Sequence, residues 1–192
     1  RSFIFNDTFT NYYNPDVGLA GAKVLSKAGH RPALAPNVCC GRPLISQGLL
    51  AEATELAARN AAALHPIAER GQRIVFLEPS CLSAVREDAP SLLRGEAQLQ
   101  AKRVAEASVL FEEFLNDVDA ARLPLKEGPT TILLHGHCHQ KAMGLLAPAK
   151  AVLSRIPGAT VVDLNAGCCG MAGSFGYVRD HFDVSRAIGE RR

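Results

Sequence analysis

The segment Arg73-Ile-Val-Phe-Leu-Glu-Pro-Ser-Cys81 sets the fold class. A short apolar run rich in β-branched residues is typical of a buried strand, and the proline that follows ends it just before a cysteine. Comparable runs recur between stretches of helical spacing, and we predict strands at residues 3–6, 32–36, 73–78, 131–135 and 160–164. Strands that alternate with helices indicate βαβ units. We therefore predict an α/β fold with a mostly parallel sheet, built from two duplicated βαβ units.

The helical stretches between these strands have recognisable ends. The first begins at Asn14-Pro15, and the second places Leu49, Ala53, Leu56, Leu64 and Ile67 on one face. Pro66 should break or kink this second helix near Leu64. A third helix is predicted over residues 98–118, and others follow Gly144 and Tyr177.

Composition narrows the class of function. The chain is 47% hydrophobic and 21% charged, which is ordinary for a globular domain, and its net charge of +2 gives no case for binding nucleic acid. No apolar run approaches the roughly 20 residues of a transmembrane helix, and no signal peptide opens the chain. We expect a cytoplasmic location, with peripheral association with the inner face of the membrane left open. The first residue is Arg1, which suggests a fragment of a longer protein.

A Cys-Cys-Gly motif occurs once in each half of the chain. Asn37-Val-Cys39-Cys40-Gly41 and Asn165-Ala-Gly-Cys168-Cys169-Gly170 each follow a predicted strand. The spacing from Thr8 to Cys39 is also nearly the same as the spacing from Cys138 to Cys168. An internal duplication explains both observations. We expect a first repeat at residues 1–120 and a second at 130–192. The second repeat is expected to be truncated, since its equivalent of Cys81 would fall beyond Arg192.

The cysteines point to metal or redox chemistry. Disulfides suit small secreted scaffolds, and neighbouring cysteines bridge each other only with strain, so disulfides and inert buried thiols are the weaker alternatives. Each cysteine lies at or after the carboxyl end of a predicted strand, the edge where ligands bind to open parallel sheets. Thiolates are soft ligands for iron–sulfur clusters, zinc or copper(I). The predicted metal ligands are Cys39, Cys40 and Cys81 in the first half and Cys138, Cys168 and Cys169 in the second.

Other residues beside the cysteines are candidates for supporting roles. Gly41 and Gly170 would let the backbone approach a bulky cofactor and leave N–H groups for sulfur, or would merely allow tight turns. His135, His137 and His139 would share one side if the strand persists, as ligands, proton-transfer groups or supports for Cys138.

Glu78 could be a ligand, a proton acceptor or the cap of the following helix. No catalytic residue is assigned from these observations. His137, His139 and Glu78 are the candidates.

These motifs resemble those of the cysteine-rich CCG-domain family. That family includes the B subunit of heterodisulfide reductase, the iron–sulfur subunits of glycolate and anaerobic glycerol-3-phosphate oxidation, and lactate-utilisation proteins. Four stretches in order, 37–50, 78–81, 134–141 and 168–177, are similar to the carboxyl-terminal portion of FAD-linked oxidases fused to iron–sulfur modules, of the D-2-hydroxyglutarate or D-lactate dehydrogenase type.

The resemblance implies an electron-transfer module of a FAD-dependent 2-hydroxy-acid dehydrogenase. FAD would belong to an upstream domain, ferredoxin-like domains would relay electrons, and a quinone or soluble carrier would accept them. This chain contains neither a flavin fingerprint nor a Cys-x-x-Cys-x-x-Cys run, so the fragment alone is expected to be inactive.

The chain departs from the fullest family pattern in its first half. Thr8 stands where a repeat would carry cysteine, and Ala84 stands where the family has the second cysteine of Cys-x-x-Cys. An ordinary cluster with an oxygen or nitrogen ligand, a zinc or iron ion, and one centre shared between the halves all stay open. An isolated fragment can lose its cluster to oxygen and appear empty or zinc-filled. A structural zinc module and a disulfide or quinone reductase site are the alternative functions.

Overall fold

The computed structural model describes residues 1–173 and 175–191, so Ser174, inside the last quoted motif, and Arg192 lie outside the described residues. The chain forms two compact units, Arg1–Lys126 and Glu127–Arg192. That the units are two copies of one repeat stays a prediction.

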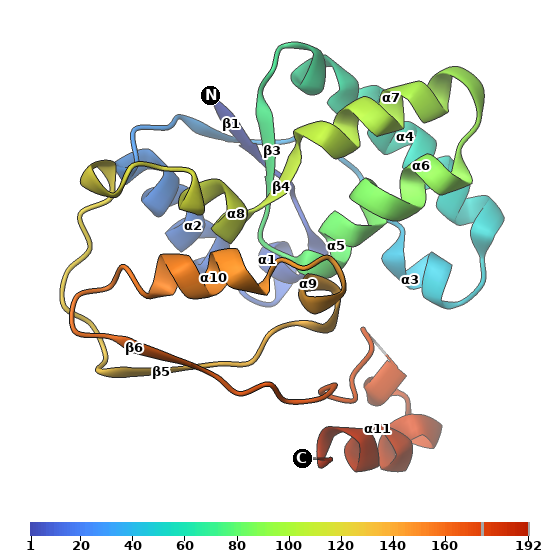
Figure 1. The fold of residues 1–192 in the computed structure, drawn as a ribbon. Helices are drawn as coiled ribbons and strands as arrows, with labels where there is room; N and C mark the ends of the chain where they lie inside the picture. The colour runs from blue at the N-terminus through green and yellow to red at the C-terminus, as the bar shows by residue number, and fades with distance from the viewer. Residues whose placement is uncertain (174, 192) are drawn as a thin grey trace. The chain divides into compact units, whose positions relative to one another are not determined.

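The first unit is built on a parallel sheet in the order β2-β1-β3-β4. Its strands are β1 (Ser2–Ile4), β2 (Pro32–Leu34), β3 (Arg73–Phe76) and β4 (Ser108–Leu110). Its helices are α1 (Thr8–Tyr12), α2 (Pro15–Lys27), α3 (Arg42–Ser46), α4 (Leu50–Glu69), α5 (Pro79–Ser83), a π-helical turn (Ala84–Asp88), α6 (Ala89–Leu92), α7 (Gly95–Ala107), α8 (Phe111–Asn116) and a 3-10 turn (Ala120–Arg122). Helices cover both faces of the sheet, with α2 and α8 on one side and α4, α6 and α7 on the other (Figure 1).

The core of this unit lies where β1 and β3 pair. The rings of Phe5 and Phe76 stack with centroids 4.4 Å apart, and both side chains are almost fully buried. Burial of two aromatic side chains stabilises the fold by several kcal/mol (about 2–3 each), so this pair anchors the two central strands.

The second unit contains a two-stranded parallel sheet. Its strands are β5 (Thr131–Leu134) and β6 (Thr160–Asp163), and its helices are α9 (Cys138–Ala142), α10 (Leu146–Leu153), 3-10 turns at Phe175–Tyr177 and Arg179–His181, and α11 (Phe182–Gly189). The α/β fold with a mostly parallel sheet is thereby confirmed. Cysteines follow β2, β3, β5 and β6 within a few residues, at the carboxyl ends of these strands.

Three local predictions were wrong. The helix predicted over 98–118 is interrupted by β4, because the fully buried Ser108 and Leu110 pair with β3 instead. Helix α4 continues through Pro66 to Glu69, since buried residues on both sides of the proline, Leu64 and Ile67, hold it in the core. Leu49 is exposed and only precedes α4.

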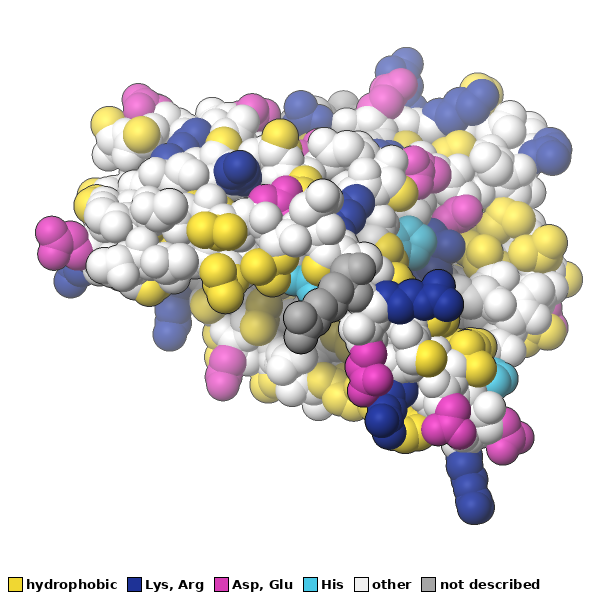
Figure 2. All heavy atoms as spheres, turned by 60° about the horizontal axis from the view of Figure 1, so that its bottom comes forward, with side chains coloured by type: hydrophobic (Ala, Val, Ile, Leu, Met, Phe, Trp, Pro, Cys, Tyr) yellow, Lys and Arg dark blue, Asp and Glu magenta, His cyan; other side chains and the backbone are white. Residues whose placement is uncertain are grey.

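The described surface mixes apolar and charged side chains. Figure 2 turns the underside of Figure 1 forward and shows hydrophobic side chains scattered among charged ones. In the second unit the exposed hydrophobic residues include Leu133, Leu164 and Phe182. None of the described helices combines the length and hydrophobicity that crossing a bilayer requires.

Candidate metal centre

The first Cys-Cys-Gly motif forms a tight loop that leads into α3. Gly41 has φ +83°, a left-handed conformation that glycine adopts without strain, and it lies at the amino end of the helix. The turn directs backbone N–H groups back toward the thiols: that of Gly41 donates to the Cys39 sulfur and that of Arg42 to the Cys40 sulfur. N–H groups in this position stabilise a thiolate or a sulfur-bound cluster.

Cys81 meets this loop from α5. The Cys40 thiol interacts with both Cys39 and Cys81, although Cys81 follows a different strand, β3, and belongs to a different helix. Cys40 and Cys81 are buried, whereas Cys39 is exposed, and none of the three forms a disulfide. The fold therefore brings the three predicted ligands of the first half together at one edge of the sheet.

The environment disfavours free thiolates. The hydrogen bond with Cys40 and then burial raise the pKa of Cys39. For Cys40, a hydrogen bond with Cys39 lowers the pKa, but the hydrogen bond with Cys81, burial and charge repulsion outweigh it and raise the pKa to about 12. The Cys39 and Cys40 thiols are therefore protonated at neutral pH, and a metal must displace their protons to bind them.

The Asn60 side chain fixes the first Cys-Cys-Gly loop by two hydrogen bonds. This side chain of α4 is only 3% exposed. Its Oδ1 accepts a hydrogen bond from the Val38 N–H at 2.9 Å, and its Nδ2 donates to the Cys39 carbonyl oxygen at 2.9 Å. Asn37 has a similar role just before the motif, since its side chain pairs with the N–H and carbonyl oxygen of Asn6.

Arg42 links the loop to the helix that carries Cys81. Its guanidinium donates to the Ser80 carbonyl oxygen at 3.4 Å, to the Ser83 hydroxyl at 3.0 Å, and to the Asp88 carboxylate. Charge-assisted hydrogen bonds of this kind are stronger than neutral ones. Arg42 thus fixes the distance between the two cysteine-bearing segments.

Glu78 caps the amino end of α5. Its Oε1 accepts hydrogen bonds from the Ser80 N–H at 3.0 Å and from the Ser80 hydroxyl at 2.6 Å, at the start of α5. This is the capping alternative weighed from the sequence. A ligand or proton-acceptor role for Glu78 stays a prediction.

The second Cys-Cys-Gly motif repeats the local geometry of the first. Gly170 also has φ +83°, and its N–H donates to the Cys168 sulfur at 3.4 Å. Helix α11 packs directly on this loop, since the Ser185 hydroxyl donates to the Gly170 carbonyl oxygen at 2.8 Å. A Cβ at Gly170 would lie 2.0 Å from the Ser185 carbonyl oxygen, so this position accepts only glycine. Cys168 and Cys169 are both exposed.

The histidine-rich segment does not form the expected row. Strand β5 ends at Leu134, so the alternation does not continue, and α9 begins at Cys138. His137 caps α9, with its Nδ1 accepting the His139 N–H at 3.2 Å and lying 4.0 Å from the exposed Cys138 sulfur.

The remaining residues of that segment support the second loop. His135 donates from Nε2 to the Gly167 carbonyl oxygen at 3.1 Å, and the Lys141 ammonium donates to the Ala166 carbonyl oxygen. These two residues hold the backbone just before Cys168, at Ala166 and Gly167.

Within residues 1–173 and 175–191, no three Cys, His, Asp or Glu side chains converge on a point where one ion could be bound. The gathered thiols, with N–H groups aimed at sulfur, are the donors that an iron–sulfur cluster binds.

Sequence reasoning missed Asn60, Asn37 and Arg42. For Asn60 a signal existed, because it falls on the apolar face of α4 between Ala57 and Leu64. A polar residue on an apolar face is costly unless it is hydrogen-bonded, so its presence indicates a partner. Asn37 and Arg42 flank the motif but carry no such signal.

The sequence that carries these cysteines is similar to that of known proteins. The cysteine-rich CCG domain family matches residues 7–86, which include Cys39, Cys40 and Cys81. Lactate utilization protein A of Anoxybacillus flavithermus is 30% identical over 187 residues, covering 90% of this chain and 73% of that protein. The chain belongs to the cysteine-rich CCG-domain family.

Two further relatives of this CCG chain are dehydrogenases or dehydrogenase subunits by name. The C subunit of anaerobic glycerol-3-phosphate dehydrogenase of Escherichia coli is 29% identical over 187 residues, covering 96% of the chain and 47% of that protein. D-2-hydroxyglutarate dehydrogenase of Pseudomonas putida is 30% identical over 199 residues, covering the whole chain and 18% of that protein. The CCG chain thus spans about half of the first relative and less than a fifth of the second.

Proposed function

We propose that this chain is the iron–sulfur electron-transfer module of a larger FAD-dependent 2-hydroxy-acid dehydrogenase. The observation that carries the proposal is the meeting of Cys39, Cys40 and Cys81 at one sheet edge, with the N–H groups of Gly41 and Arg42 donating to sulfur. Relatives whose names denote dehydrogenase subunits or dehydrogenases support the redox role.

In each unit, cysteines would bind the cluster and a glycine would donate an N–H group to sulfur. Cys39, Cys40 and Cys81 are the ligands in the first unit, and Cys138, Cys168 and Cys169 are the ligands in the second. A bound cluster takes up and releases single electrons. Gly41 and Gly170 present N–H groups to sulfur, and burial of Cys40 and Cys81 keeps water from their side of the site.

The rest of the electron path lies outside this chain. We assign FAD and the oxidation of a 2-hydroxy acid to an upstream flavin domain, and the intermediate transfers to ferredoxin-like domains of the same protein or complex. The electrons then pass to a quinone or a soluble carrier. The module acts on the cytoplasmic side, and contact with the inner face of the membrane depends on the acceptor.

Dithiol chemistry is a second candidate, and one observation favours it. The Cys40 thiol interacts with two other thiols, so Cys40 and Cys81 could form a disulfide while a substrate disulfide takes up their two electrons and two protons. This reaction requires no metal, which separates it from the first proposal.

Anaerobic purification tests the proposal. Iron and acid-labile sulfide should co-purify with the chain, and reduction should produce an electron paramagnetic resonance signal. Cys39→Ser and Cys168→Ser, made singly, should each lower the iron content, because each removes a ligand from a different unit. A redox-silent protein that contains only zinc, or no metal, would contradict the proposal. Oxidation of Cys40 in such a protein would favour dithiol chemistry.

A further inference from the structure

Asn60 is an unusual residue for its place in α4. It lies in the middle of a 20-residue helix, on the face where Ala53, Ala57 and Ala61 are buried. Asparagine is a weak helix former, and a buried amide without partners costs about 1–3 kcal/mol. Its presence there requires a compensating interaction.

Two backbone groups of the cysteine loop provide that interaction. Asn60 accepts from the Val38 N–H and donates to the Cys39 carbonyl oxygen, both at 2.9 Å. One planar amide therefore fixes the backbone on either side of the first ligand, much as a neighbouring strand would. The loop continues from this fixed point into the left-handed turn at Gly41.

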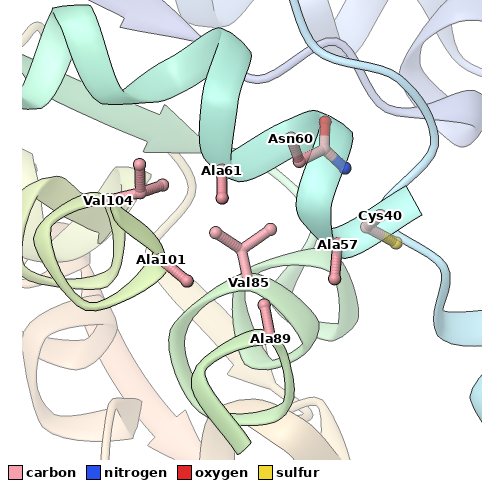
Figure 3. Close-up of a pocket in the computed structure, with 8 residues that line it drawn as sticks. All are labelled: Cys40, Ala57, Asn60, Ala61, Val85, Ala89, Ala101 and Val104. Atoms are coloured by element: carbon pink, nitrogen blue, oxygen red, sulfur yellow. The ribbon is translucent and has the colours of Figure 1, made fainter. Parts of the chain in front are cut away.

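A small, mostly apolar cavity lies beside Asn60. Its volume is about 10 Å³, Cys40 also lines it, and its other walls are Ala57, Ala61, Val85, Ala89, Ala101 and Val104. Figure 3 shows Asn60, Cys40 and the alanines of α4 on one side of it, and Val85, Ala89, Ala101 and Val104 on the other. A space of about one water molecule with mostly apolar walls offers few polar partners to hold a water on this side of Asn60.

We propose that Asn60 is a positioning residue for the first-unit centre, an inference that rests on the proposed iron–sulfur function. By fixing the Val38–Cys39 backbone, it keeps the Gly41 and Arg42 N–H groups aimed at the Cys39 and Cys40 sulfurs. Hydrogen bonds to sulfur stabilise the reduced, more negative cluster and so raise its reduction potential. Asn60 thus tunes the centre without touching it.

The second unit supports its loop differently. There the groups that hold the backbone before Cys168 are His135 and Lys141, both from the segment between β5 and the end of α9. A change at Asn60 should therefore act on the first centre and leave the second unchanged.

Two substitutions and a control test this inference in the anaerobically purified chain. Asn60→Leu removes both hydrogen bonds at similar volume. Asn60→Asp retains the size and the acceptor for Val38 but loses the donor, which keeps the test open if the leucine variant does not fold. Asn116→Asp makes the same chemical change at an exposed residue at the end of α8, away from the cysteine loop.

The readouts are the midpoint potential of each centre, at measured iron content, and hydrogen exchange of the Val38 amide. Asn60→Leu should lower the first potential and speed Val38 exchange by roughly tenfold, the equivalent of one hydrogen bond. Asn60→Asp should lower the same potential more than Asn116→Asp does. Wild-type potential in an iron-replete Asn60→Asp protein would overturn the inference.

The proposed function and this inference fail separately. Absence of iron from the wild-type chain would refute the proposed function, and the tuning of a cluster would fall with it. Slow Val38 exchange in the wild type and fast exchange in Asn60→Leu would still establish the positioning of the loop. Unchanged Val38 exchange in a folded Asn60→Leu protein would overturn the positioning itself.

Discussion

Arg42 and Asp88 form an ion pair that joins the cysteine loop to the end of the π-helical turn. Both side chains are partly buried, so the pair is less screened than a surface salt bridge. Because Arg42 also donates to Ser80 and Ser83, it binds the whole segment that carries Cys81.

Arg42→Lys should weaken this link while keeping the charge. A lysine ammonium cannot reproduce the planar set of donors, so we expect a loss of stability of about 1–2 kcal/mol and a lower iron content. Chemical denaturation and iron analysis measure the two effects. Arg103→Lys is the control, because its ion pair with Glu106 is exposed and should contribute little. Equal effects of the two changes would show that Arg42 does not hold the site together.

The two motif glycines should differ in their tolerance of alanine. Both have φ +83°, and a left-handed alanine costs about 1–2 kcal/mol. At Gly41 the nearest atom to an added Cβ is 3.8 Å away, whereas at Gly170 the Ser185 carbonyl oxygen is 2.0 Å away. We expect Gly41→Ala to cost only the backbone strain and Gly170→Ala to displace α11 as well.

Limited proteolysis and thermal unfolding check this pair of changes. Gly48→Ala, at φ +76° with no atom within 4 Å of the added Cβ, gives the cost of backbone strain alone. Gly41→Ala should match it, while Gly170→Ala should expose the segment after Tyr177 to protease. Similar behaviour of all three variants would mean that α11 does not pack on the second motif.

Much of this architecture was predictable from sequence, and the failures have physical causes. The strands that end at Leu34, Phe76, Leu134 and Asp163 were found because apolar, β-branched runs stand out between helices. Strand β4 was missed because three residues inside a helical pattern carry too weak a signal, and only pairing with β3 makes them a strand. Here tertiary contacts override local preference.

The site was predictable only to a limited extent. The meeting of Cys39, Cys40 and Cys81 follows from parallel topology, since β2 and β3 lie on either side of β1 and the carboxyl ends of all three strands share one edge. The partners of Asn60 lie 21 and 22 residues away, which no local pattern reveals. The histidine row failed because His137 starts a helix by capping it, so a period of two no longer applies.

Alkylation of the metal-free, reduced chain should distinguish the cysteines. The thiolate is the reacting form, and Cys40, with a pKa of about 12 and a buried side chain, should react slowly at pH 8. Its rate should rise close to tenfold per pH unit through pH 9 and 10. Exposed Cys138 is the internal comparison. Mass spectrometry of timed iodoacetamide reactions gives both rates, and equally fast labelling of Cys40 and Cys138 at pH 8 would contradict the burial and contacts described for Cys40.

Glu112 should make the first unit less stable as pH rises. Burial, and then repulsion from Glu113, raise the pKa of Glu112, opposed by a backbone hydrogen bond at the start of α8. Because the folded pKa is above the unfolded value, the folded state binds more protons, so stability is greatest below the unfolded pKa and falls as pH rises through the folded pKa. Glu112→Gln removes this loss. We expect the variant to be more stable than wild type by about 0.5–1 kcal/mol at pH 7 and equal to it at pH 4.

Urea denaturation at both pH values measures the difference, with Glu55→Gln as the same change at an exposed position of α4. A Glu112→Gln advantage that is the same at pH 4 and pH 7 would show that ionisation of this carboxyl is not its source.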